Sequence, residues 1–201
     1  MRSGLVEIGN VARLQIQTSS LKCGAGRARY YDPVAIASVD AISVTRDGAT
    51  ARIDDVERLD VHHNRHPDSK QRDGINPLSF GFRSHYAMMR ARFGAHLTDG
   101  IAGENILVDT AHDVELSDVI SGFVVMTSAG QEIAFSTVSV AHPCVEFSRF
   151  ALHEPMADAN VVSEALRYLD HGLRGYYASA ATNEPGHIHV GDRVFRIVES
   201  D

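Results

Sequence analysis

The chain has 201 residues, of which 44% are hydrophobic and 22% charged, as expected for a soluble globular protein rather than a disordered one. Its formal net charge of −7 argues against a broad nucleic-acid-binding face, because such faces are usually basic. No apolar run approaches the roughly 20 residues that cross a bilayer, and the first residues lack the apolar core of a secretion signal. We therefore expect one cytoplasmic domain over residues 1–201, with no nucleic-acid or membrane partner.

The two cysteines restrict the chemistry that the sequence can support. Cys23 and Cys144 lie far apart and form no Cys-x-x-Cys pair. A structural disulfide is not expected in a reducing compartment. A cysteine-type zinc site is not expected either, because two thiolates would need two further ligands from elsewhere.

The first part of the chain is predicted to form short strands separated by polar segments. Alternating apolar residues over 11–17 predict a half-buried strand, and the polar, glycine-containing segment 19–33 predicts a loop. Two further β-type runs flank Asp47 and Gly48, which predict the turn of a hairpin. Residues 58–77 have few apolar side chains and many turn formers, so we expect an exposed loop there.

Two helices are predicted, each from apolar residues that recur at spacings of three and four. The first follows the loop, has Ser84 as its N-cap and ends at Gly94. The second spans about 161–171, with Asn160 as its N-cap and Gly172 just after its end.

The remaining segments are again short strands. A glycine-rich turn runs into an apolar strand over 100–109, two strands flank 128–130 as a hairpin, and a closing strand ends near residue 197. Many short strands with two isolated helices do not form a repeating βαβ pattern. We therefore expect a mainly β protein, a closed, antiparallel-rich β-barrel with a few helical insertions.

The segment "VAHPCVEF" (140–147) holds the first candidate site. Pro143 restricts His142 to an extended backbone and ends regular strand pairing, which places Cys144 at a strand end beside a histidine. Two interpretations remain open. Cys144 is either a buried packing residue, as free cysteines often are, or a reactive thiolate able to act as a nucleophile, a persulfide carrier or a soft-metal ligand.

Two weaker candidates lie elsewhere in the chain. The histidines His62, His63 and His66 could reach over a pocket or bind a divalent metal, or they could belong to a solvated polar loop. In the second candidate, "GIAGENI" (100–106), the glycines permit tight turns and close approach to a ligand, and Asn105 offers both donors and acceptors.

Three blocks, in this order, resemble the MOSC domain, the C-terminal module of molybdenum-cofactor sulfurases and of the mitochondrial amidoxime-reducing proteins. They are "DGIAGENILVD" (99–109), "AHPCVEF" (141–147) and "GLRGYYASAATNEPGHIHVGDRVFRI" (172–197). "FRSHYAMMRARFG" (82–94) is similar to the helix that precedes the first block. The resemblance covers most of residues 8–198 and implies a single domain with a closed barrel of the MOSC, or PK β-barrel-like, type.

The resemblance also implies a molybdenum–molybdopterin cofactor. Cys144 takes the position of the family's functional cysteine, as the metal ligand or the carrier of a persulfide. The other residues that it places at the cofactor are Glu104, Asn105, His142, Arg149, Gly175, Tyr177 and His63. An anionic cofactor phosphate needs cations, for which the candidates are Lys22, Arg83, Arg149 and Arg174.

The family resemblance leaves several functions open. The chain could be a component of a molybdenum-dependent oxidoreductase that reduces N-hydroxylated compounds with a reductase partner, or a sulfurtransferase supplied by a cysteine desulfurase. It could also be a non-catalytic small-molecule-binding barrel or interaction module. We expect no pyridoxal-phosphate domain. A Gly-x-x-Gly-Asp-x-His element of many stand-alone members is replaced by "RLDVHHNRHPDSKQ", in which we recognise only the histidines.

Overall fold

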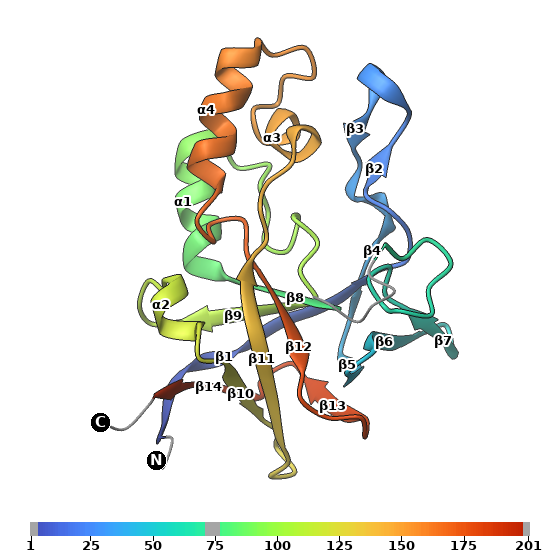
Figure 1. Ribbon diagram of the computed structural model, residues 1–201, viewed down its shortest axis with the longest axis vertical. Helices are drawn as coiled ribbons and strands as arrows, with labels where there is room; N and C mark the ends of the chain where they lie inside the picture. Colours follow the sequence, from blue (N-terminus) through green and yellow to red (C-terminus); the bar gives the residue numbers. More distant parts are fainter. Residues whose placement is uncertain (1–3, 71–76, 199–201) are drawn as a thin grey trace.

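Seven strands close into a barrel in the computed structural model, which describes residues 4–70 and 77–198 (Figure 1). Around the ring they are β1 (Gly4–Gln17), β14 (Arg193–Val198), β10 (Phe123–Met126), β11 (Glu132–Val140), β12 (Tyr176–Ala180), β8 (Leu78–Phe82) and β9 (Ile106–Thr110). Only β8 and β9 run parallel; every other neighbouring pair is antiparallel. The predicted closed, antiparallel-rich barrel is confirmed.

Aromatic side chains fill the interior of the barrel. The rings of Phe123 and Phe135 stack with centroids 4.5 Å apart, and Phe80 lies 4.5 Å from Phe123 and 5.3 Å from Tyr176. Such pairs stabilise a core beyond the area that they bury. The strand predicted over 11–17 is the end of β1, but a bulge after Val11 breaks its simple alternation.

A second sheet of four strands packs beside the barrel in the order β13 (Gly186–His189), β5 (Ala41–Thr45), β6 (Gly48–Ile53) and β7 (Val56–Leu59). The hairpin predicted around Asp47 and Gly48 is confirmed as β5–β6. The predicted turn pair was wrong by one residue: the two loop residues are Arg46 and Asp47, because Thr45 pairs with Gly48 at the start of β6. Gly48 has a φ of 126°, a conformation that favours glycine.

The prediction of a loop over 19–33 was wrong in part. This segment contains β2 (Lys22–Cys23) and β3 (Tyr30–Tyr31), which pair as a hairpin arm with a 3-10 turn, η1 (Gly26–Ala28), at its tip. A second turn, η2 (Pro33–Ala35), leads into β4 (Ile36–Val39), which pairs with β1. The arm stands beside α3 (Val145–Ala151) because Tyr31 packs against Phe147 and Phe150.

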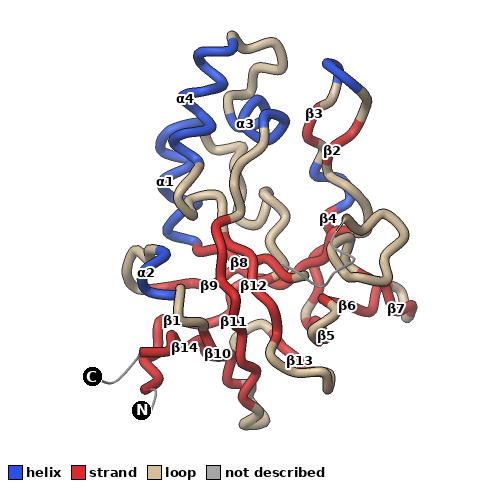
Figure 2. Tube along the Cα trace, in the orientation of Figure 1, coloured by secondary structure: helices blue, strands red, loops and turns tan. Residues whose placement is uncertain are grey.

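The longer helices gather above one end of the barrel (Figure 2). They are α1 (Arg83–Phe93), α3 and α4 (Ala159–Leu169); the short α2 (Leu116–Val119) lies beside the barrel. The two predicted helices are confirmed as α1 and α4, whereas α2 and α3 were missed. Both predicted N-caps were wrong, because Ser84 and Asn160 lie inside their helices.

Ion pairs attach α1 to the segment that enters β9. Asp99 accepts hydrogen bonds from Arg83 Nε at 2.8 Å and from Arg90 Nη1 at 2.6 Å. Burial alone would raise the pKa of Asp99, but the two arginines outweigh it and hold the pKa below its usual value.

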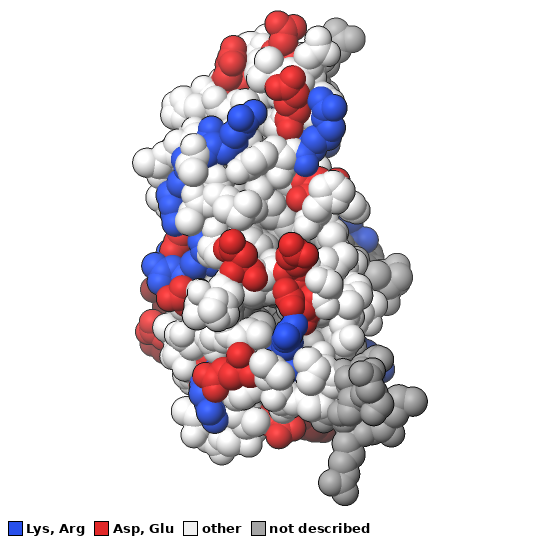
Figure 3. Space-filling model, turned by 90° about the vertical axis from the view of Figure 1, so that its left-hand side faces the viewer, with Lys and Arg blue, Asp and Glu red and all other residues white. Residues whose placement is uncertain are grey.

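Over the side of the molecule that carries α1, α2 and α4, acidic and basic side chains are interspersed (Figure 3).

The prediction of an exposed loop over 58–77 was wrong for its first part. β7 extends to Leu59, and the turns that follow over 60–70 fold against the barrel with Asp60 and His63 almost completely buried. Residues 71–76 lie outside the described part of the chain. The polar composition was misleading because the buried Asp60 carboxylate finds its hydrogen-bond donors within the protein.

Candidate functional site

A cavity of about 220 Å³ lies where the hairpin arm, the 60–70 turns, the segment before α3 and the start of β12 meet. Its lining is Gln17, Ser20, Leu21, Lys22, Tyr31, Val61, His62, Asp68, Lys70, His142, Cys144, Arg174 and Tyr177. These residues come from widely separated segments, so the tertiary fold assembles the cavity.

Cys144 contributes a thiol to this cavity from the N-cap position of α3. Its Sγ accepts a hydrogen bond from the backbone N–H of Phe147 at 3.4 Å. The prediction that Cys144 lies at a strand end needs correction, because β11 ends at Val140 and an irregular segment separates the two. Both cysteines are free and partly exposed, and Cys144 also packs against the aromatic cluster around Phe147.

Cations outnumber carboxylates in the lining. Lys22, Lys70 and Arg174 carry positive charge, against the single carboxylate of Asp68. Arg174 Nη2 donates to the carbonyl of Ala102 at 2.9 Å, and its guanidinium lies 5.6 Å from the centroid of the Phe147 ring. Among the described residues, Arg174 forms no ion pair with a carboxylate. The cavity therefore favours an anionic ligand.

Arg174 stays charged despite its surroundings. Burial acts to lower its pKa, but nearby Tyr177, Tyr31 and Glu104 outweigh burial and raise the pKa above its ordinary value. Tyr31 is held in its neutral form, because burial raises the pKa of its hydroxyl, which donates to the carbonyl of Ile101 at 2.7 Å.

His62 reaches the cavity from the 60–70 turns and is held from behind by Asp60. His62 Nδ1 lies 2.8 Å from Asp60 Oδ1, and the Asp60 carboxylate is completely buried. Burial on its own would raise the pKa of Asp60, but His62 and the backbone N–H groups of Gln17 and His62 outweigh it and lower the pKa. Asp60 was missed in the sequence. Asp60 and His62 keep the Asp-x-His spacing of the Gly-x-x-Gly-Asp-x-His element, and Val56 and Leu59 stand where that element has its glycines.

Asn105 lies behind the lining rather than in it. Its side-chain oxygen accepts from Ser79 N at 2.9 Å and Ser79 Oγ at 3.2 Å. Its amide nitrogen donates to Asp60 Oδ2 at 2.9 Å and to the carbonyl of Gln15 at 3.3 Å. Asn105 therefore joins three barrel strands to the residue that holds His62.

Glu104 is also buried behind the lining. Its carboxylate accepts a hydrogen bond from the hydroxyl of Tyr86 at 2.7 Å. Gly175, another predicted residue, packs beside it: a Cβ there would lie 2.9 Å from the carbonyl oxygen of Phe80 and 3.4 Å from Glu104 Cγ, and its φ is 122°. Both residues shape the wall of the cavity without lining it.

Glu104 predicts a pH dependence of stability. Burial raises its pKa, against the lowering effect of Arg174 and of the Tyr86 hydrogen bond, so the folded protein holds the Glu104 proton more tightly than the unfolded chain. This contribution is complete below the unfolded pKa and is lost as the pH rises through the folded pKa. We expect Glu104→Gln to match the wild type near about pH 4 and to become the more stable protein towards about pH 7.

Urea unfolding at a series of pH values measures this difference. Glu164→Gln, on the exposed face of α4, is the matched control and should show no such trend. A stability gap that is constant with pH, or that favours the wild type near about pH 7, contradicts the prediction.

The other predicted residues divide between the cavity and the rest of the molecule. His142 and Tyr177 line the cavity, and His142 Nδ1 lies 2.8 Å from Asp170 Oδ1. Arg83 lies on α1 in ion pairs with Asp99 and Asp109, while Arg149 lines a separate groove between α3 and the hairpin arm. His63 is buried outside the lining.

The three histidines of the 60–70 turns do not converge. Nδ1 of His62 pairs with Asp60, Nδ1 of His63 accepts from Arg65 N at 3.2 Å, and Nδ1 of His66 accepts from Asp68 N at 3.1 Å. Within residues 4–70 and 77–198, no group of three or more histidine, cysteine or acidic side chains could hold a metal ion. The interpretation of this cluster as a divalent-metal site was therefore wrong for the described residues.

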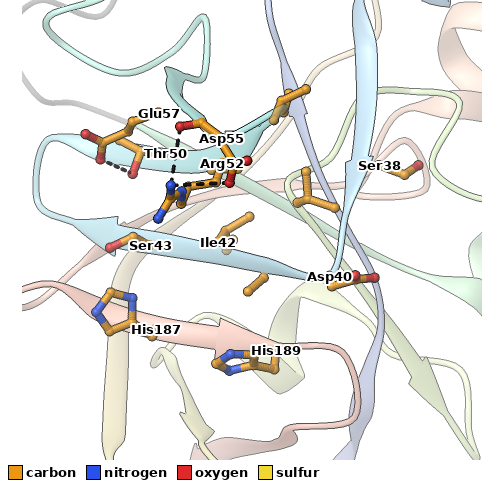
Figure 4. A pocket seen from close by; sticks show the side chains of 14 residues that line it. Ser38, Asp40, Ile42, Ser43, Thr50, Arg52, Asp55, Glu57, His187 and His189 are labelled. Carbon is orange, nitrogen blue, oxygen red and sulfur yellow. Dashed lines mark hydrogen bonds and ion pairs between the residues drawn. The ribbon is translucent and has the colours of Figure 1, made fainter.

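A larger cavity, of about 870 Å³, lies over the second sheet (Figure 4). His187 and His189 enter it from β13, opposite Arg52 and Glu57 of the β6–β7 hairpin. It contains no thiol, Arg52 is paired with Asp55, and Glu57 accepts from the hydroxyl of Thr50. This cavity is large because it lies over an open face of the sheet. The smaller cavity holds both a thiol and several cations, and we therefore take it as the candidate site.

The fold and the cavity define a small closed β-barrel in which one cavity holds a thiol and several cations. The family model of the MOSC domain matches residues 76–195, and the chain belongs to the MOSC domain family. No curated protein matches the chain. None of the helices in the described part is long and apolar enough to cross a membrane.

Solved structures support this fold. YuaD from Bacillus subtilis superposes with a TM-score of 0.57 at 11% identity, covering 99% of each chain. A hypothetical protein gives a TM-score of 0.57 at 13% identity over 96% of this chain and 68% of its own. YiiM from Escherichia coli gives 0.50 at 15% identity over 82% of this chain and 66% of its own. At such identities the similarity establishes the fold alone.

Proposed function

We propose that the cavity at Cys144 binds a molybdenum–molybdopterin cofactor, with Cys144 Sγ as a ligand of the metal. The observation that carries this proposal is the meeting of a free thiol with Lys22, Lys70 and Arg174 in one cavity. Thiolate is a soft ligand suited to a thiophilic metal, and the cations suit the phosphate of the cofactor. The donor set therefore fits the group that the family implies.

The residues around the cavity have separate tasks in this proposal. The three cations would hold the phosphate, and Tyr31 and Tyr177 would flank the ligand. Glu104, Asn105 and Gly175 would support the wall, while His63 and Arg149 lie away from the lining and are given no contact. The volume of about 220 Å³ is below the roughly 300 Å³ at which pockets for drug-sized ligands begin, so the cavity would enclose only part of such a cofactor.

When bound, the cofactor would supply two-electron chemistry, such as removal of oxygen from an N-hydroxylated compound. Such a reaction needs electrons from a reductase partner. This chain's own residues would bind the anion, ligate the metal and present donors to the substrate. His142, which directly precedes Pro143 and lines the cavity, is one of these donors.

Sulfur transfer is a second candidate, favoured by the partial exposure of the Cys144 thiol. In that reaction the Cys144 thiolate attacks the outer sulfur of a persulfide on a cysteine desulfurase. The sulfur–sulfur bond of the donor breaks, a new one forms on Cys144, and the donor thiolate leaves. No net oxidation takes place, because the sulfur moves with its oxidation state unchanged.

One pair of variants tests these functions. We expect wild-type protein from a cofactor-replete host to contain molybdenum and to release a fluorescent pterin, and Cys144→Ser to lose the metal. Cys23→Ser, the matched control on the hairpin arm, should keep both. Elemental analysis and pterin fluorescence are the measurements.

The same proteins separate the alternatives. In a second experiment, metal-free wild type is incubated with a desulfurase and cysteine. A gain of the mass of one sulfur atom on Cys144 supports sulfur transfer instead. Wild type with neither cofactor nor added sulfur contradicts both functions. A small molecule retained equally by wild type and Cys144→Ser points to a non-catalytic binding barrel.

A further inference from the structure

We propose that Asp60 and His62 make the Cys144 cavity a proton-coupled oxyanion site, in which His62 takes up a proton when an oxyanion binds. The inference deepens the proposed function, because it concerns the anion-binding part of the same site. It rests on the hydrogen-bond geometry behind His62.

The Asp60 carboxylate accepts four hydrogen bonds. Oδ2 accepts from Gln17 N at 2.7 Å and from Asn105 Nδ2 at 2.9 Å, and Oδ1 accepts from His62 N at 2.9 Å and faces His62 Nδ1 at 2.8 Å. Two of these donors are backbone N–H groups, which can only donate. The Asn105 amide must donate as well, since its oxygen is turned to Ser79 N.

The hydrogen bonds to the Asp60 carboxylate decide which residue holds the proton that lies between Asp60 and His62. Three fixed donors already point at the carboxylate, so only the His62 ring could accept a proton from it. A carboxylic acid is a much stronger acid than an imidazolium, so the proton resides on His62 Nδ1. Asp60 is then an ionised, fully buried carboxylate.

The assignment decides what His62 offers to a ligand. With Nδ1–H held by Asp60, the other ring nitrogen, Nε2, has no partner among the described residues. In neutral His62 this nitrogen carries a lone pair, which repels an oxyanion. In protonated His62 it carries N–H and positive charge, which attract one. An oxyanion therefore selects the protonated state.

Other titratable or charged groups face the same cavity. The hairpin arm contributes Lys22 and Tyr31, and the 60–70 turns contribute Asp68 and Lys70. The segment before α3 contributes His142 and Cys144, and the start of β12 contributes Arg174 and Tyr177.

Of these groups, His142 most resembles His62, because it also pairs with an aspartate. The two pairs differ in burial: the His142 side chain is 76% exposed and the Asp170 side chain 31%, against 19% for His62 and 0% for Asp60. Water screens the His142 pair much more strongly, so its charge is less coupled to a ligand in the cavity.

Sulfate is the probe, because its own charge does not change over the pH range of histidine titration. Sulfate binding is followed by NMR at constant ionic strength at about pH 6 and about pH 8. We expect the wild type to bind sulfate roughly tenfold more weakly at the higher pH. His62→Gln should lose this dependence and bind with a constant affinity, supported by the lysines and Arg174.

Matched variants make the test specific. His66→Gln changes a histidine of the same turns that does not line the cavity, and it should behave as the wild type. His142→Gln and Cys144→Ser, which replace the other histidine and the thiol of the lining, should keep the pH dependence. Asp60→Asn should reduce it; because this change is at a fully buried position and lowers stability, the conclusion depends on His62→Gln.

The outcomes either support or overturn the proposal. Sulfate affinity in the wild type that is independent of pH overturns it, as does a pH dependence that survives in His62→Gln or disappears in His142→Gln. These titrations use protein without cofactor. A failure to find molybdenum or pterin therefore contradicts the proposed function and leaves this result intact, and the reverse also holds.

Discussion

Asn105→Ala is expected to lower the free energy of unfolding by about 3–5 kcal/mol. The side chain is completely buried and forms hydrogen bonds with Ser79, Gln15 and Asp60. Alanine would leave the N–H of Ser79 and the carbonyl of Gln15 without these partners and would remove a donor from a buried carboxylate. Each buried polar group left unsatisfied costs about 1–3 kcal/mol.

Urea unfolding measures this loss. Asn183→Ala, at an exposed position, is the matched control and should change stability by less than about 0.5 kcal/mol. In Asn105→Asp the new side chain is nearly the same size as asparagine. It places a second carboxylate beside Asp60, at the position where Asn105 Nδ2 lies 2.9 Å from Asp60 Oδ2. This substitution should therefore be at least as destabilising as alanine. An Asn105→Asp protein as stable as the wild type would contradict this account of the network.

Arg174→Gln is expected to weaken binding of sulfate to the Cys144 cavity by roughly 10- to 100-fold. The guanidinium is anchored by Ala102 and by the ring of Phe147, and it forms no direct ion pair among the described residues, so it can still donate to an anion in the cavity. A hydrogen bond to a charged group contributes about 1.5–3 kcal/mol, which corresponds to this range.

NMR titration with sulfate measures the affinity. Arg174→Lys should lie between wild type and Arg174→Gln, because lysine keeps the charge but loses the planar group that stacks on Phe147. Arg167→Gln, on the exposed side of α4, is the control and should bind as the wild type does. Equal weakening by Arg167→Gln would show that only the overall charge matters and would contradict a role for Arg174 in the cavity.

The sequence identified only some of the residues of the candidate site. It pointed to Cys144, His142 and Tyr177, which do line one cavity, and to Arg174 and Lys22 as possible anion ligands. Local patterning did not identify Asp60, because a single aspartate after a strand looks like an ordinary turn residue; its spacing to His62 was the one signal, and it was missed. Only the packing of the 60–70 turns against β1 and Asn105 buries that carboxylate and makes its partners visible.

Local patterns in this chain therefore determined the class of fold, the helices α1 and α4, the β5–β6 and β10–β11 hairpins and the candidate cysteine. These depend on periodicity, turn residues and spacing, which act over a few neighbouring residues. Three features depended on the tertiary structure: the partial burial of the polar residues over 58–70, the hairpin arm that brings Lys22 and Tyr31 to Cys144, and the hydrogen bonds that orient His62. The physical reason is that burial and hydrogen-bond partners are set by residues tens of positions away, such as Gln17, Asp60 and Asn105, and no local pattern records them.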